Sequence, residues 1–159
     1  MNQDQLRPPP SFLPTTAVLE MTYRCNHRCL FCSCPWDSED GAFDRKAEMD
    51  TVEWKSLIDK LSQMGVANLA FTGGEALMKE DILHILAHAA NSQTEHIETV
   101  DGKLVSTMAP PKVYLLSNGK LIDRQILQFC KQHDIQLSMS LPGLTTLEEH
   151  TRDGDVNHI

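Results

Sequence analysis

Three cysteines near the amino-terminal end of the chain, Cys25, Cys29 and Cys32, have the spacing of a metal-binding loop. Iron–sulfur clusters are normally held by four cysteine thiolates, and this loop offers three that are closely spaced. In a cubane cluster, three protein thiolates leave one iron open to a ligand that is not part of the protein. The spacing therefore predicts an iron–sulfur site with one free iron.

Two other interpretations of these cysteines remain open. A structural zinc module needs four Cys or His ligands, usually as two close pairs; Cys34 and His27 lie nearby, but no second pair follows. A disulfide framework is less favoured, because the cysteine count of five is odd and the chain has no secretory start. We therefore expect reduced thiols, with Cys34 as a spare one.

The run from Cys25 to Cys32 resembles the signature of the radical S-adenosylmethionine (SAM) superfamily, in which an aromatic residue, here Phe31, precedes the last cysteine. The resemblance implies a 4Fe-4S cluster on Cys25, Cys29 and Cys32, with Phe31 beside the cofactor. It also implies that SAM chelates the free iron and is cleaved reductively to a 5'-deoxyadenosyl radical, which abstracts hydrogen from a substrate. In such chemistry the protein mainly positions and shields the cofactor.

A second motif, Gly73-Gly74-Glu75, follows a short apolar stretch. Two glycines at a strand end permit close backbone approaches that a side chain would forbid, although most such pairs are only turns. The motif lies one strand–helix unit after the cysteines. At this place it resembles the family's Gly-Gly-Glu motif, whose backbone and carboxylate receive the SAM amino group. Together the two motifs leave little support for the zinc alternative.

Ser117 and Asn118 are further candidates, at the end of a strand expected at 112–119. The corresponding family strand often ends in Thr-Asn-Gly, and Ser-Asn-Gly resembles it with serine in place of threonine. The resemblance implies that Ser117 and Asn118 contact the cofactor. An ordinary Asn-Gly turn is the alternative.

The last candidates lie in a strand expected at 135–143 and just beyond it. Ser138 and Ser140 alternate with apolar residues there, and small hydroxyl groups can hydrogen-bond a cofactor carboxylate or ribose. Their pattern resembles the fourth strand of SAM enzymes that mature peptides and proteins, and Ser140 is the preferred contact. Arg152 matches a family segment in which an arginine pairs with the SAM carboxylate.

Hydrophobic periodicity predicts the elements that position these residues. Strands are expected at 17–23, 68–72, 112–119 and 135–143. A helix is expected after each of the first three strands: the first begins at Asp50, and the other two cover about 80–90 and 123–133. Asp50 and Glu53 form a capping-box signal. One apolar helix stripe is expected on Trp54, Leu57, Ile58, Leu61 and Met64. Cys130 is expected to be a small buried hydrophobe.

Strand–helix repeats with cofactor motifs at strand ends are typical of a parallel α/β fold. The resemblance narrows this expectation to a partial (β/α) barrel of the radical SAM type, with about four βα units and an incomplete carboxyl-terminal end. We expect an extended lead-in over 1–16 and the core domain over 17–159, with an inserted hairpin near 96–105. The open sheet edge would accept a partner chain.

Composition limits the remaining functions. The formal net charge of −8 argues against a broad nucleic-acid surface, and no apolar run approaches the length of a membrane span. We therefore expect a cytoplasmic radical SAM enzyme with a peptide, protein or small-molecule substrate and a reductant such as flavodoxin or ferredoxin. The alternative is a noncatalytic cluster-binding fragment or partner subunit.

Overall fold

The computed structural model describes residues 14–27, 29, 32 and 48–141. A four-stranded parallel sheet has the order β1 (Thr16–Glu20), β2 (Asn68–Thr72), β5 (Lys112–Ser117) and β6 (Gln136–Met139). The connections contain α1 (Thr51–Gln63), the 3-10 helix η3 (Ala76–Met78), α2 (Ile82–Asn91) and α3 (Arg124–Gln132). The prediction of an α/β fold with a parallel sheet is confirmed.

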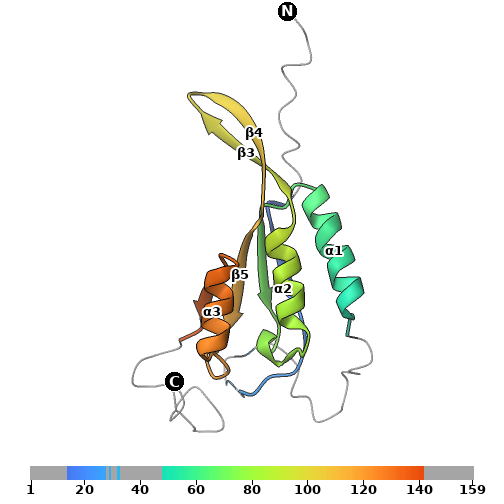
Figure 1. Cartoon of the computed structure of the whole chain (residues 1–159), viewed down its shortest axis with the longest axis vertical. Helices are drawn as coiled ribbons and strands as arrows, with labels where there is room; N and C mark the ends of the chain where they lie inside the picture. Colours follow the sequence, from blue (N-terminus) through green and yellow to red (C-terminus); the bar gives the residue numbers. More distant parts are fainter. Residues whose placement is uncertain (1–13, 28, 30–31, 33–47, 142–159) are drawn as a thin grey trace, which may run out of the picture.

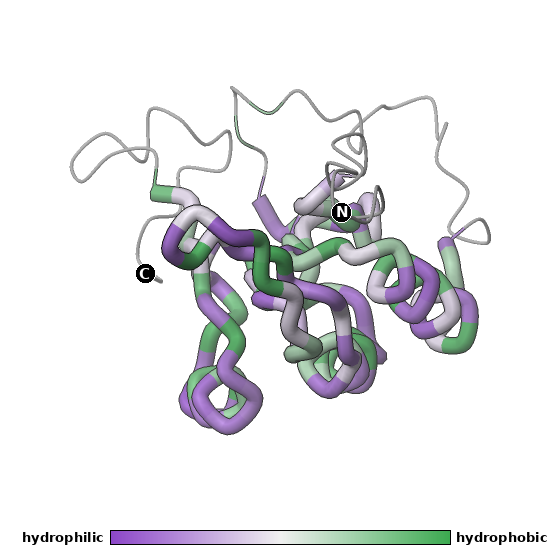
Figure 2. The backbone as a smooth tube through the Cα atoms, turned by 90° about the horizontal axis from the view of Figure 1, so that it is seen from above, coloured by the Kyte–Doolittle hydropathy of each residue, from purple (hydrophilic) through white to green (hydrophobic). Residues whose placement is uncertain are grey.

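The helices lie on one face of the sheet, as Figure 2 shows from above. Leu19 of β1 lies beside Phe71 of β2, which lies beside Leu115 of β5. All three side chains are buried. Neighbours in register point to the same face of a sheet, so this row packs against the helices. The helices contribute the buried residues Trp54, Ile58, Ile82, Ile85, Leu86, Ala89 and Cys130.

Helix α1 begins at the predicted capping box. The Asp50 carboxylate accepts a hydrogen bond from the Glu53 backbone N–H, and the Glu53 carboxylate accepts one from the Asp50 N–H, both at 2.8 Å. Trp54 and Ile58 are buried as expected, but Met64 is 44% exposed. That part of the predicted stripe is wrong, because Met64 is the C-cap residue, where the chain leaves the helix.

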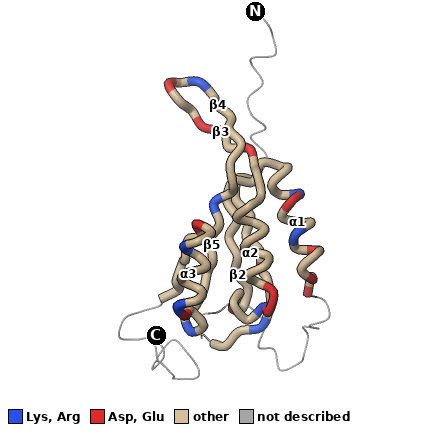
Figure 3. The backbone as a smooth tube through the Cα atoms, in the orientation of Figure 1, with Lys and Arg blue, Asp and Glu red and all other residues tan. Residues whose placement is uncertain are grey.

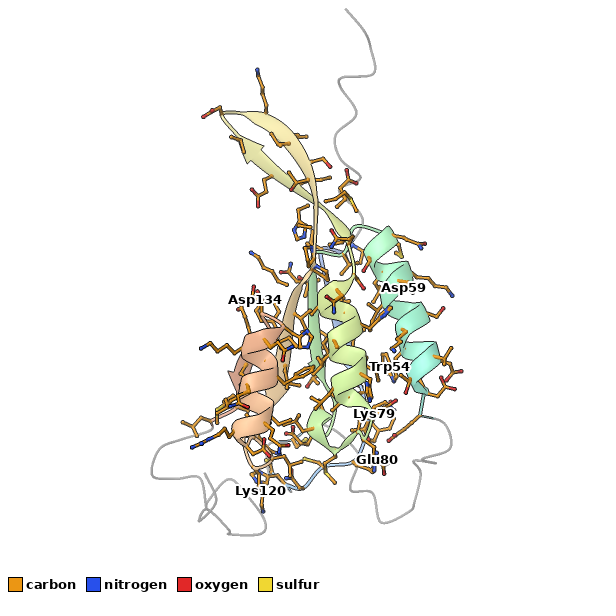
Figure 4. The ribbon with its side chains drawn as sticks, in the orientation of Figure 1. Trp54, Asp59, Lys79, Glu80, Lys120 and Asp134 are labelled. Carbon is orange, nitrogen blue, oxygen red and sulfur yellow. The ribbon has the colours of Figure 1, made fainter. Side chains whose placement is uncertain are left out.

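A buried lysine ties the start of α1 to the segment before α2. The Lys79 ammonium donates to the Met49 carbonyl oxygen at 3.0 Å and lies 3.2 Å from the Asp81 carboxylate, which also accepts from the Thr51 hydroxyl. Burial opposes ionisation of Asp81, but the bonds from Thr51 and Lys79 outweigh it and hold the pKa of Asp81 below its usual value. Figure 4 shows Lys79 below Trp54, on the side where α1 begins.

Between α2 and β5 the chain forms an antiparallel hairpin of β3 (Thr94–Val100) and β4 (Lys103–Ala109). It is longer than the expected 96–105, and its tip is Asp101-Gly102, with φ of 49° and 73°, as a tight hairpin turn requires. The hairpin projects from the end of the sheet opposite the cysteine segment (Figure 1). The hairpin lies in the connection that leads into β5, so it is at the edge of the sheet where the parallel strands begin. The cysteines follow β1, so they are at the edge where the strands end.

Other strand boundaries also differ from the expected ones. Strand β1 starts one residue before the expected 17 and ends at Glu20, and β6 is shorter than 135–143. Along α1 and at the hairpin tip, Lys positions are interspersed with Asp and Glu (Figure 3). Within the described ranges, no helix combines the length and apolar character needed to cross a membrane.

Candidate cofactor site

The sequence motifs converge at the carboxyl-terminal edge of the sheet. Parallel neighbouring strands end at the same edge, so the loops after β1, β2 and β5 lie side by side. Figure 4 labels Lys120 after β5 at this edge, and Asp134 before β6 at the opposite one. The cysteine loop, the Gly-Gly-Glu motif and the Ser-Asn-Gly motif therefore share one region.

Backbone pairing between β1 and β2 continues beyond both strands into these motifs. The Met21 N–H donates to the Thr72 carbonyl at 2.9 Å, and the Gly74 and Glu75 N–H groups donate to the Thr22 and Arg24 carbonyls, both at 2.8 Å. These are ordinary hydrogen-bond lengths. The Gly-Gly-Glu backbone thus fixes the path of the chain into Cys25.

Gly73 and Gly74 are required by this close approach. Gly73 has φ of 139°, and a Cβ atom there would lie 2.5 Å from the Thr22 carbonyl oxygen. A Cβ atom on Gly74 would lie 2.2 Å from the Arg24 carbonyl oxygen and 3.1 Å from the Cys25 Cβ. Non-bonded heavy atoms do not pack at about 2 Å. Only glycine fits at either position without moving the cysteine loop.

The Glu75 carboxylate joins two of the loops. Its side chain is buried, Oε1 accepts from the Leu77 N–H at 3.2 Å, and Oε2 accepts from the Asn118 N–H at 2.8 Å. A carboxylate oxygen has more than one acceptor site, so both oxygens keep capacity for a further donor. Glu75 therefore supports the loop after β5 in addition to any role toward a ligand.

Glu75→Gln is expected to lower the free energy of unfolding by about 1–3 kcal/mol, because the new amide group turns an N–H toward a buried backbone donor. Urea denaturation measures the change. Glu80→Gln is the matched control, since Glu80 is exposed and should change stability by less than about 0.5 kcal/mol. Equal losses in the two variants would contradict the role assigned to Glu75.

Asn118 contacts the cysteine loop directly. Its side-chain Nδ2 donates to Asn26 Oδ1 at 2.8 Å and lies 3.9 Å from Cys25 Sγ. Its Oδ1 accepts from the Lys120 N–H at 3.0 Å, which closes a local turn. Asn118 therefore combines an ordinary turn contact with a contact to the first cysteine.

The serine candidates occupy different environments. Ser117 is buried, its hydroxyl accepts from the Gly119 N–H, and its carbonyl accepts from the Ser140 N–H, both at 3.0 Å. Ser138 and Ser140 are exposed. Ser138 pairs in register with Leu116, so it belongs to the face without helices. The structure thus places Ser138 toward an accessible surface and makes Ser117 part of the loop framework.

Sequence reasoning missed a polar cluster at the base of the cysteine loop. The buried Thr22 hydroxyl donates to Glu48 Oε1 at 2.6 Å and accepts from the Arg24 N–H at 3.1 Å. Arg24 Nη2 also lies 3.8 Å from Glu48 Oε2. These polar contacts join the segment before the cysteines to the segment before α1. The available signal was a polar threonine near the end of the strand expected at 17–23, shortly before the cysteines.

The same reasoning missed two polar residues on the face of the sheet without helices. Glu20 pairs in register with Thr72, one position beyond the buried pair of Leu19 and Phe71. Side chains alternate along a strand, so Glu20 and Thr72 point away from the helices. They therefore add polar side chains to this face near the cysteine loop, whereas Ser138 lies on β6 beside the apolar Leu116.

The three thiols of the loop differ in exposure. Cys25 and Cys29 are half-buried, Cys32 is exposed, and the Cys32 N–H donates to the Cys29 carbonyl at 3.1 Å. Burial raises the pKa of the Cys25 thiol, and nearby Glu75, Cys29 and Cys32 raise it further, although a bond from the His27 N–H lowers it. Burial also raises the pKa of Cys29. Cluster loading would therefore release protons.

The donor set suits an iron–sulfur cluster by ligand type, since three cysteine thiolates are soft sulfur ligands. In the described part of the chain, no three His, Cys, Asp or Glu residues are grouped to hold a single metal ion. Phe31, Cys34 and Arg152 lie outside the described residues.

The fold and the site define a class of α/β proteins that carry a cysteine loop after the first strand of a parallel sheet. Within that class, this chain belongs to the radical SAM superfamily, whose sequence profile matches residues 19–157. The prediction of the family is confirmed. The superfamily consists of enzymes that use a 4Fe-4S cluster and SAM.

Two relatives are PqqA peptide cyclases. The one from Rhodopseudomonas palustris is 36% identical over 77 residues, and the one from Xanthomonas oryzae pv. oryzae is 37% identical over 76 residues. Each match covers 48% of this chain but only 19% of the cyclase. The crystal structure of BtrN in complex with AdoMet and 2-DOIA has a similar fold, with a TM-score of 0.58 and 20% identity over 83% of this chain and 48% of BtrN.

Proposed function

We propose that this chain is the cofactor-binding part of a radical SAM enzyme that modifies a peptide or protein. The cluster would be held by Cys25, Cys29 and Cys32, with SAM beside it. The observation that carries the proposal is the backbone pairing of Gly74 and Glu75 with the residues leading into Cys25, because it holds the two cofactor motifs together. The likeness to PqqA peptide cyclases supports a peptide substrate.

The cluster and SAM, when bound, supply a 5'-deoxyadenosyl radical for hydrogen abstraction. The residues of this chain hold and orient the cofactors. The Glu75 carboxylate keeps acceptor capacity that suits the SAM amino group, while the exposed hydroxyls of Ser138 and Ser140 suit its polar groups. By family resemblance, Phe31 and Arg152 complete the contacts.

We also propose that the sheet is part of a (β/α) barrel and that the face without helices lines its interior. Its strands follow one another in chain order, with helices on the other face, which is the repeating arrangement of such barrels. Val18 lies on the face without helices and is 63% exposed. Strand β1 stands at one end of the sheet order, so its outer edge has no partner among the described strands, which suits pairing with further chain or a partner.

The deciding experiment is anaerobic reconstitution with iron and sulfide, reduction, addition of SAM and assay of 5'-deoxyadenosine. Release of deoxyadenosine above the level of a Cys29→Ala control supports the enzyme. A bound cluster without SAM cleavage would instead indicate a noncatalytic partner module. Uptake of zinc without a cluster would overturn both interpretations. The reduced thiols that the cluster requires favour a cytoplasmic location. Reductive cleavage of SAM consumes one electron, which calls for a reductant such as flavodoxin or ferredoxin.

A further inference from the structure

The side-chain amide of Asn118 is oriented with its donor toward the sulfur of Cys25. Nδ2 lies 3.9 Å from Cys25 Sγ and 2.8 Å from Asn26 Oδ1. The other end of the amide decides this orientation, because Oδ1 accepts from the Lys120 backbone N–H at 3.0 Å. An amide flip would place an N–H against that donor, so the bonding network assigns Nδ2 to the cysteine loop.

The backbone of Asn118 is fixed as well. Its N–H donates to Oε2 of the buried Glu75 at 2.8 Å, and the other oxygen of Glu75 accepts from Leu77. Asn118 is therefore held through both its main chain and its side chain. A donor held in this way needs little rearrangement when charge appears next to it.

We infer that Asn118 is a positioning residue that donates a hydrogen bond to the Cys25 sulfur and raises the reduction potential of the cluster. The inference rests on the proposed function, in which Cys25 is a cluster ligand. Hydrogen bonds to ligating sulfurs are among the features by which a protein sets cluster potentials. One-electron reduction makes the cluster and its sulfurs more negative, so a donor at Cys25 stabilises the reduced form more than the oxidised form.

Cys25 receives a second hydrogen bond, from the His27 backbone N–H at 3.4 Å. That donor belongs to the loop itself and cannot be removed by a side-chain substitution. The Asn118 donor comes from the loop after β5 and can be removed. Two substitutions separate its effects: Asn118→Ser keeps a hydroxyl acceptor for Lys120 but is too short to reach the sulfur, whereas Asn118→Asp keeps the size and the acceptor but turns an oxygen toward the sulfur.

The experiment is a redox titration of the reconstituted full chain without SAM, with the reduced cluster followed by electron paramagnetic resonance. For Asn118→Ser, the ratio of reduced to oxidised cluster at a fixed potential should fall about tenfold. For a one-electron couple, this corresponds to a reduction potential that is lower by ~59 mV. Asn118→Asp should lower it further, because it adds negative charge. Asn91→Asp is the matched control, since the exposed Asn91 amide donates to the Ala87 carbonyl of its own helix, away from the cysteine loop, and should keep the wild-type potential.

A second measurement uses the unmodified protein and so does not depend on how the variants fold. With nitrogen-15 in the asparagine side chains, the reduced cluster should show hyperfine coupling to a side-chain nitrogen. A loaded wild type without that coupling, or Asn118→Ser with the wild-type potential, would overturn the inference alone. A wild type that takes up no cluster would overturn both the proposed function and the inference.

Discussion

Replacement of any one of Cys25, Cys29 and Cys32 by alanine is expected to abolish cluster binding. The loop supplies three thiolates where clusters normally have four ligands, so the loss of one more leaves too few to hold the irons. After anaerobic reconstitution, iron and sulfide per chain should fall from about four each to background. Production of 5'-deoxyadenosine should fall to background with them.

Two further cysteines provide controls. Cys130 is buried in α3 against the core, so Cys130→Ala should cost about 1 kcal/mol of stability and keep the full cluster. Cys34→Ala should also keep the cluster. Loss of iron in Cys34→Ala would show that the wrong three cysteines have been assigned or that the fourth iron is not free.

Gly74→Ala is expected to reduce stability and cluster content together. The added Cβ would lie 2.2 Å from the Arg24 carbonyl oxygen, and backbone hydrogen bonds hold both segments in place, so neither can move freely. Overpacking of this kind costs about 3 kcal/mol or more when backbone must shift. Urea denaturation and iron content measure the two effects, and iron content should drop at least about twofold because the Cys25 loop is displaced.

Gly102→Ala is the same chemical change at a site without crowding. Gly102 also has a positive φ, of 73°, but a Cβ there would meet nothing within 4 Å. We expect a cost of about 1–2 kcal/mol from the backbone conformation and no change in cluster content. If Gly74→Ala retained wild-type stability and iron content, the close approach of the two loops would not be what positions Cys25.

Features that depend on local sequence could be predicted. The capping box of Asp50 and Glu53 joins residues three apart, and α1 buries Trp54 and Ile58 of the stripe expected from periodicity. Element ends were less predictable, because β6 stops at Met139 and Met64 is exposed at a helix end. These ends depend on where neighbouring strands and helices stop supporting the chain, which local patterns do not report.

The amino-acid sequence alone was enough to identify the cysteine triad, the Gly-Gly-Glu motif and the superfamily, because these are short patterns whose chemistry depends on residue type and spacing. The contacts that organise the site came only from the fold. Thr22 reaches Glu48 across 26 residues, Glu75 reaches Asn118 across 43, and Asn118 reaches Cys25 across 93. The first contact closes the long connection from β1 to α1. The other two exist because parallel strands place distant loops at one edge, in a register that no local pattern specifies.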